Sequence, residues 1–186
     1  VVSIVPWAIG ENLTGALADA DMGDTLLSYI AGRGFYPLHL TNEYSTFAAK
    51  GTDQDNIRES FTGDLSDIAG QTINALVVNS NNTGGAATVN LTGLGAGNSL
   101  AVTSGALLFT LNTGADNNTE HAIDLSGFDA ITTAADEYVI HVVNPSSANN
   151  TARLTTTINS ALTSSADLVK SGRGTLALAV DNAFTD

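Results

Sequence analysis

Cysteine is absent from this sequence of 186 residues, and basic and aromatic residues are scarce. Without cysteine the fold contains no disulfide and the chain supports no thiol chemistry. Only 6 Lys and Arg stand against 19 Asp and Glu, which gives a formal net charge of −13 at pH 7. Such a surface repels phosphate backbones and anionic lipid headgroups, so we expect no nucleic-acid partner. No segment reaches the roughly 20 apolar residues that span a bilayer, and we expect no membrane insertion by this segment.

Aromatic residues make up 6% of the chain and charged residues 13%, whereas hydrophobic residues make up 43%. The hydrophobic share is sufficient for a continuous core. That core would consist mainly of Leu, Val, Ile and Ala, which suit narrow, stacked interiors, while Asn, Thr and Ser supply the polar surface. The composition therefore favours an extracellular protein, built as one domain or as a stretch of a longer repetitive one.

From Thr72 onward the sequence repeats one pattern, in which a short alternating apolar run is followed by a cluster of Asn, Gly, Ser and Thr. Each run has the length of a strand, and none has helical spacing. The runs cover residues 72–79, 87–94, 99–110, 122–126, 138–144, 152–158 and 168–180. Short strands with regular turns fit a sandwich, a closed barrel or a β-solenoid. Small aliphatic residues and recurrent Asn at strand ends favour the solenoid, with coils of about twenty residues.

The first seventy residues differ, because aromatic residues are denser there and the charges are clearer. Residues 16–31 fit one short helix, since their leucines are partly at helical spacing, although Gly23 and Asp24 interrupt it. Loops that decorate early coils fit the same residues. We therefore expect residues 1–70 to form a decorated or capping section of the solenoid. Residues 71–186 are expected to form regular coils that end in a repeat motif.

A motif near the end of the chain is the most specific pattern in the sequence. Its residues are Leu168, Lys170, Gly172, Gly174, Thr175, Leu176, Leu178, Asn182 and Phe184. They resemble the autotransporter-associated β-strand repeat, whose pattern is L-x-K-x-G-x-G-T-L-x-L-x-x-x-N-x-Y-T-G. Phe184 stands where that repeat usually has Tyr, and Asp186 stands where it has Gly. The resemblance implies an all-β, right-handed parallel β-helix (β-solenoid) of the passenger type, secreted to the bacterial cell surface or the extracellular space.

The motif also has a physical interpretation of its own. Gly172 and Gly174 permit a positive φ, which lets the chain turn a tight corner. After the corner, Leu176 and Leu178 alternate inward, and the residues between them point outward. The motif therefore predicts a glycine turn followed by a strand with one buried face.

A short acidic run is the candidate metal site. Asp19, Asp21 and Asp24 form a D-x-D-x-x-D pattern around Gly23, and their carboxylates are the type of ligand that calcium prefers. The spacing matches neither an EF-hand loop nor a calcium-binding repeat, so a solvated loop is the competing interpretation. Calcium is the one cofactor that the sequence suggests.

The remaining polar residues suggest no catalytic centre. His39, His121 and His141 are too scattered for a metal-ligand spacing, and no nucleophile elbow of the G-x-S-x-G type occurs. A β-helix that cleaves anionic polysaccharides needs a basic groove, whereas the basic residues are spread along the whole chain. We therefore assign no catalytic residue and expect that the protein is not an enzyme.

These patterns lead to two functional expectations and a third, disfavoured one. The first is a structural component of a bacterial cell-surface or extracellular fibre, with head-to-tail self-assembly as a hypothesis. Its partners would be copies of itself or further coils of a longer chain. The alternative is an adhesin passenger segment that binds surface glycans or host surfaces. A polysaccharide-cleaving β-helix enzyme is the third class.

Overall fold

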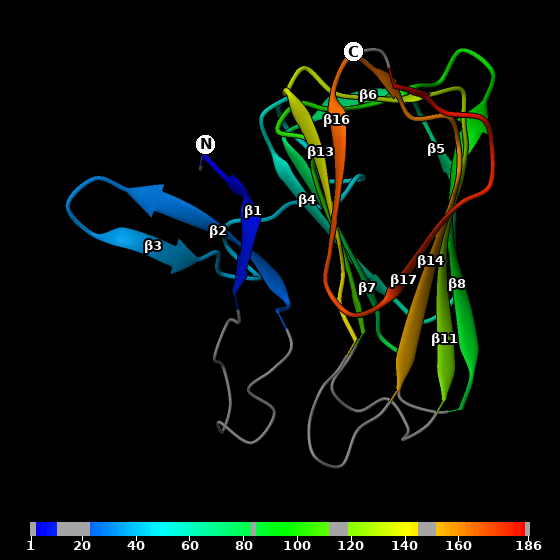
Figure 1. Ribbon diagram of the computed structural model, residues 1–186, viewed down its shortest axis with the longest axis horizontal. Helices are drawn as coiled ribbons and strands as arrows, with labels where there is room; N and C mark the ends of the chain where they lie inside the picture. The colour runs from blue at the N-terminus through cyan, green and yellow to red at the C-terminus, as the bar shows by residue number, and fades with distance from the viewer. Residues whose placement is uncertain (1–2, 11–22, 83–84, 112–118, 145–151, 185–186) are drawn as a thin grey trace.

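The computed structural model describes residues 3–10, 23–82, 85–111, 119–144 and 152–184. These residues form β-strands, turns and irregular connections, with no helix among them, so the expected all-β class is confirmed (Figure 1). Within the described ranges there is accordingly no helix long and apolar enough to cross a membrane.

Most strands belong to parallel sheets. Sheet I contains β16 (Asp167–Ser171), β13 (Glu137–Val142), β10 (Ala106–Leu111), β7 (Ala75–Ser80) and β4 (Asn56–Phe61), in that order. Sheet II contains β17 (Thr175–Leu178), β14 (Arg153–Asn159), β11 (Glu120–Phe128), β8 (Ala87–Gly95) and β5 (Asp64–Ile68). Sheet III contains β12 (Ile131–Thr132), β9 (Leu100–Val102) and β6 (Gln71–Ile73), and a short pair joins β15 (Thr163–Ser164) to β18 (Ala183–Phe184). Sheets I and II face each other, with β6 across one end (Figure 1).

The chain passes through sheets I, II and III in that order and then returns to sheet I, and β15 and β18 take the third position in the last two passes. We call the three strands of one pass a triplet, and each triplet pairs with the next. In sheet I, Leu76 pairs with Leu107, 31 positions later, and Leu107 pairs with Ile140, 33 positions later. The expected repeat of about twenty residues is therefore wrong in the middle of the stack. One reason is the length of the connections from sheet I to sheet II in these two triplets, residues 81–86 and 112–119, because only residues 62–63 separate β4 from β5.

Parallel pairing begins before residue 70, where the regular section was expected to start. β4 pairs in parallel with β7, and β5 pairs in parallel with β8. The division of the chain at residue 70 stays a prediction. The parallel pairing shows that the first triplet of the stack consists of β4, β5 and β6.

The core lies between the three sheets and runs through the whole stack. In sheet II, Leu65, Leu91, Leu125, Ile158 and Leu178 form a column in which each residue pairs with the next. The three middle members are fully buried, and the two end members are partly buried against the same core. Full burial of one such side chain contributes about 1.5–3 kcal/mol. Each triplet is therefore stabilised mainly by the triplets above and below it.

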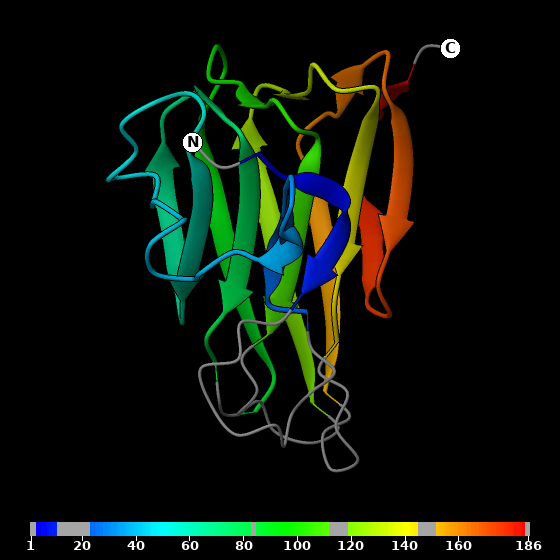
Figure 2. The same ribbon diagram turned by 90° about the vertical axis from the view of Figure 1, so that its left-hand side faces the viewer.

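A second, antiparallel sheet covers the outside of sheet I. It consists of β1 (Val5–Gly10), β2 (Thr25–Ile30) and β3 (Gly34–Pro37), and it projects to one side of the stack (Figures 1 and 2). Its Leu26 and Leu38 pack with outward side chains of sheet I, which are Ala75, Val77, Ala106 and Leu108, and with Val143 directly after β13. Both faces of β7 and β10 are thereby buried. This explains why β7 and β10 are buried at every position.

The helix expected over residues 16–31 is wrong where the structure describes it. Residues 16–22 lie outside the described ranges, and Thr25–Ile30 form β2. From Leu26 to Tyr29 the burial alternates as in a strand, because Leu26 and Ser28 are buried whereas Leu27 is half-buried and Tyr29 is exposed. The following turn contains Gly32 with φ 85°, a left-handed conformation that suits a hairpin and not a helix.

The two glycines of the repeat motif play different roles. Gly172 has φ 80°, as the turn requires. Gly174 does not have a positive φ, so the expected turn conformation is wrong at that position. A Cβ atom on Gly174 would lie 2.8 Å from the Leu154 carbonyl oxygen, so close packing requires glycine there. Leu176 and Leu178 pack against the core and Thr175 is exposed, which is the predicted alternation.

Gly172→Ala and Gly34→Ala form a matched test of this packing. Both glycines have a positive φ, 80° and 84°, so either alanine costs about 1–2 kcal/mol in backbone strain. A Cβ on Gly172 would also collide with the Val142 carbonyl, whereas nothing lies within 4 Å of a Cβ on Gly34. We expect Gly172→Ala to lower the free energy of unfolding by about 2 kcal/mol more than Gly34→Ala. Equal losses in chemical denaturation would contradict the described turn.

Candidate functional site

The stack has an open edge at its last triplet. β16 ends sheet I and β17 ends sheet II, and within the described residues neither strand has a partner on its outer side. We call these two strands the carboxyl-terminal edge. Leu168, Leu176 and Leu178 point toward the core but are only partly buried, because no further triplet covers them among the described residues. An uncovered strand edge with half-buried leucines is a pairing surface.

The motif residues build this edge. The Lys170 ammonium donates a hydrogen bond to the Gly172 carbonyl oxygen at 2.6 Å, and the Gly174 N–H donates to the Val142 carbonyl at 2.8 Å. Asn182 accepts a hydrogen bond from the Leu162 N–H at 2.8 Å. The backbone of Phe184 in β18 pairs with that of Ser164 in β15, and the Phe184 side chain is outside the part that the structure describes. The motif thus forms the turn, the edge strands and the corner of one triplet.

The opposite edge of sheet I is covered. Ser45 pairs with the outer side of β4, donating to the Asn56 carbonyl and accepting from the Arg58 N–H, both at 2.8 Å. Two residues on, the Phe47 N–H donates to Glu59 Oε1 at 2.7 Å, and the Phe47 ring packs against the core. Burial raises the pKa of Glu59, and this hydrogen bond opposes the rise. We call residues 45–47 the cap segment.

The sequence analysis did not identify the cap segment. Phe47 was counted among the dense aromatic residues of the first seventy, and that density is the one signal that pointed to it. Its contact with β4 depends on a connection between β3 and β4 that contains no regular element. No periodic pattern therefore marks it.

Asparagine side chains link neighbouring triplets at a corner of the stack. Asn74 Nδ2 donates to Asn56 Oδ1 at 2.7 Å, and the Thr103 hydroxyl donates to Asn74 Oδ1 at 3.3 Å. Asn56 begins β4, Asn74 lies between the first triplet and the second, and Thr103 lies between the second triplet and the third. These asparagine side chains therefore satisfy polar side-chain groups between triplets.

The candidate calcium site falls mostly outside the described ranges. Asp19 and Asp21 lie among the residues that the structure does not describe, and Asp24 is half-buried beside the positively charged Arg58. In the described part of the chain no three His, Asp or Glu side chains come close enough to hold a metal ion. Calcium binding by the acidic run stays a prediction.

The three histidines lie in separate parts of the molecule. The His39 ring accepts from the Thr41 N–H, and His121 Nε2 lies 2.9 Å from the Thr119 hydroxyl. His141 is almost fully buried between β13 and β1, where its Nε2 lies 2.8 Å from the Pro6 carbonyl oxygen. Since a carbonyl only accepts, Nε2 carries the hydrogen. The three histidines therefore do not form a common site. The hydrogen bond of His141 to Pro6 connects the antiparallel sheet to sheet I.

Comparison with known proteins gives no match to a family model, a curated protein or a solved structure. The class of the protein is therefore defined by its fold, which is all-β with parallel sheets.

The His141 contact predicts a loss of stability in mild acid. Burial lowers the pKa of His141 below its ordinary value of 6.5, and the hydrogen bond to Pro6 opposes this only in part. The unfolded chain therefore takes up the proton first, so stability is complete above about pH 6.5 and falls as the pH drops through that value toward the lowered pKa. We expect the thermal midpoint to fall between about pH 7.5 and pH 5.5.

The variant His141→Gln is the control for this pH dependence. Glutamine keeps a neutral donor for the Pro6 carbonyl and does not titrate. The midpoint of the variant should change less over the same pH interval, as measured by circular dichroism. Parallel pH profiles for the two proteins would exclude His141 as the group responsible.

Proposed function

We propose that the triplets are coils of a right-handed parallel β-helix, and that the protein is a non-catalytic structural segment of a bacterial cell-surface or extracellular fibre. The support is the repeated pairing of each triplet with the next through three parallel sheets. In such a stack the backbone hydrogen bonds run along the long axis, and each coil buries its apolar side chains against its neighbours. These properties suit a stiff stalk that can be lengthened by adding coils.

The sequence motif supports the same proposal. Residues that resemble the autotransporter-associated β-strand repeat occupy the turn, the edge strands and the corner of the last described triplet. If the resemblance extends to function, the segment belongs to a secreted passenger. The short connection from β16 to β17 would then be the regular coil geometry, and the longer connections in earlier triplets would be decorations.

The observation on which the proposal depends is the difference between the two ends of the stack. The carboxyl-terminal edge is open, whereas the cap segment occupies the outer side of β4. On this proposal, further β-structure is added at the carboxyl-terminal edge, as coils or as a second copy. Head-to-tail assembly in full register would require the cap segment to leave β4, so a second copy meets this edge first through β5 and β6.

An adhesin segment is the second candidate function. The observation that favours it is a group of exposed aromatic side chains on the antiparallel sheet, where Trp7 is 64%, Tyr29 54% and Phe35 56% exposed. Large apolar side chains exposed together mark interaction surfaces more often than single ones do. The two functions are compatible, because the aromatic group and the carboxyl-terminal edge belong to different sheets.

Leu176→Asp and Thr175→Asp test the open edge. Leu176 points to the half-covered end of the core, whereas its neighbour Thr175 is exposed on the outside of the same strand. We expect the parent protein to associate at high concentration. Leu176→Asp should stay monomeric, because association would bury an unpaired carboxylate. Thr175→Asp should associate like the parent. Sedimentation velocity and electron microscopy measure the association. The circular dichroism spectrum of each variant, compared with the β-sheet spectrum of the parent, is the control for folding. Association that is equally strong in both variants would exclude this edge as the contact.

A further inference from the structure

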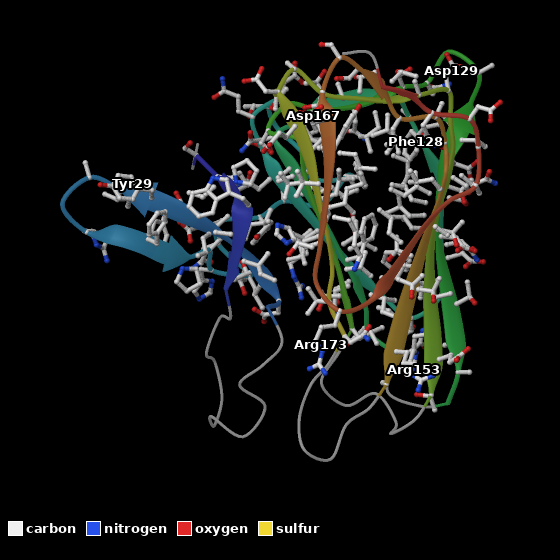
Figure 3. All side chains as sticks on the ribbon, viewed as in Figure 1. Tyr29, Phe128, Asp129, Arg153, Asp167 and Arg173 are labelled. Carbon is white, nitrogen blue, oxygen red and sulfur yellow. The ribbon has the colours of Figure 1, made fainter. Side chains whose placement is uncertain are left out.

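Three exposed rings on the antiparallel sheet form one cluster. The chain has 1 Trp, 4 Tyr and 6 Phe, and three of these eleven side chains are more than half exposed and in contact. The Tyr29 and Phe35 rings are 5.3 Å apart at 59°, and the Trp7 and Phe35 rings are 5.9 Å apart at 70°. Phe35 thus contacts both neighbours, and the Trp7 indole remains 64% exposed. Figure 3 labels Tyr29 on the part of this sheet that projects from the stack.

Trp7 also forms one wall of a cavity between β1 and sheet I. The cavity has a volume of about 400 Å³, which lies in the range of small-molecule and side-chain pockets. Pro6 and Trp7 line it from β1, and Val139 from β13 forms its apolar floor. The cavity therefore has one exposed aromatic wall and one aliphatic surface.

The remaining wall is acidic. Asp136, Glu137 and Asp167 line it, and all three are exposed. Glu137 and Asp167 pair directly with each other in the parallel ladder between β13 and β16. Like charges at paired positions repel each other and destabilise a sheet. A cationic group bound in the cavity would relieve that repulsion.

No cation from the described part of the chain occupies this position. The residues that line the cavity include neither Lys nor Arg. The two ion pairs between described side chains are Lys50 with Asp53 and Arg153 with Glu120. In Figure 3, Asp167 lies near the upper ends of the strands, whereas Arg153 and Arg173 lie near the lower ends. The acidic wall is therefore left for an external cation.

We propose that this cavity binds arginine side chains of a basic peptide segment on a partner protein. A guanidinium stacks on an indole face and donates paired hydrogen bonds to carboxylates, and the cavity offers both groups. The same carboxylates do not approach closely enough to hold a metal ion. Three carboxylates exceed the charge of one arginine, so a run of two or three basic residues matches the site. The net charge of −13 attracts such a segment from a distance.

The geometry of the rings favours arginine over a sugar. A flat sugar-binding platform needs coplanar rings, whereas the rings here are inclined at 59° and 70°. A single indole face beside carboxylates fits the small planar guanidinium. Asp167 is the first residue of β16, but the proposal uses its carboxylate and not the pairing of that strand with further coils, so it is tested separately from the proposed structural role.

The protein contains its own reporter for this site, because Trp7 is its one tryptophan. Acetylated and amidated triarginine is titrated into the full chain while the tryptophan emission is recorded at low salt. We expect a saturable change in emission that weakens as salt is added. Tricitrulline with the same end groups is the matched probe, since citrulline keeps the shape of arginine but has no charge. It should bind at least about tenfold more weakly.

Charge-neutralising variants locate the binding. Glu137→Gln and Asp167→Asn should each weaken triarginine about three- to tenfold. Asp129→Asn removes the same charge from an exposed residue outside the cavity, labelled in Figure 3, and should leave the affinity unchanged. Trp7→Ala, followed by calorimetry, should abolish measurable binding.

Three results would overturn the proposal. Equal affinity for triarginine and tricitrulline would remove the role of charge. Equal weakening by Asp129→Asn and Asp167→Asn would reduce the binding to a general effect of net charge. Tighter binding of a neutral oligosaccharide such as cellotriose, unaffected by Glu137→Gln, would make the aromatic cluster a glycan site instead.

Discussion

The structure depends on in-register parallel pairing between successive triplets. The column of Leu65, Leu91, Leu125, Ile158 and Leu178 makes this plain, because each member pairs with the next and the middle members are fully buried. A shift of one position would turn every side chain of a strand to the opposite face and expose the column. The turns that contain glycine and the asparagine hydrogen bonds between triplets are secondary to this constraint. They help to bring each triplet into the register that the column requires.

The same constraint makes the ends of the stack unlike its middle. A middle triplet is covered on both sides, whereas a terminal triplet has one side to cover by other means. At β4 the cap segment pairs with the strand and inserts Phe47 against the core. At β16 and β17 the described residues provide no such cover, and Leu176 and Leu178 remain half-buried. The antiparallel sheet has a different role. It covers the apolar outer faces of β7 and β10 in sheet I, and its own exposed aromatic side chains face solvent.

Strands of the stack after residue 72 could be predicted from the sequence, because a period of two is visible where one face of such a strand is buried, whereas β4 and β5 were not predicted. Residues 87–94 and 152–158, for example, correspond to Ala87–Gly95 and Arg153–Asn159. The second layer over sheet I could not be predicted in this way. β7 and β10 are apolar on both faces, and nothing in their own residues says which distant segment covers them. The acidic cavity was missed for a similar reason, since Trp7 lies more than a hundred positions from Glu137 and Asp167.

Residue-resolved hydrogen exchange along β17, measured on the monomer, tests the open parallel edge most directly. The Ala179 N–H donates to the Ile158 carbonyl at 3.0 Å. In a parallel ladder the N–H of Ala177 then also faces β14, and those of Leu176 and Leu178 face the free edge. The account predicts slow exchange at Ala177 and Ala179 and fast exchange at Leu176 and Leu178, with protection of the latter pair on association. Uniform protection along β17 in the monomer would contradict it.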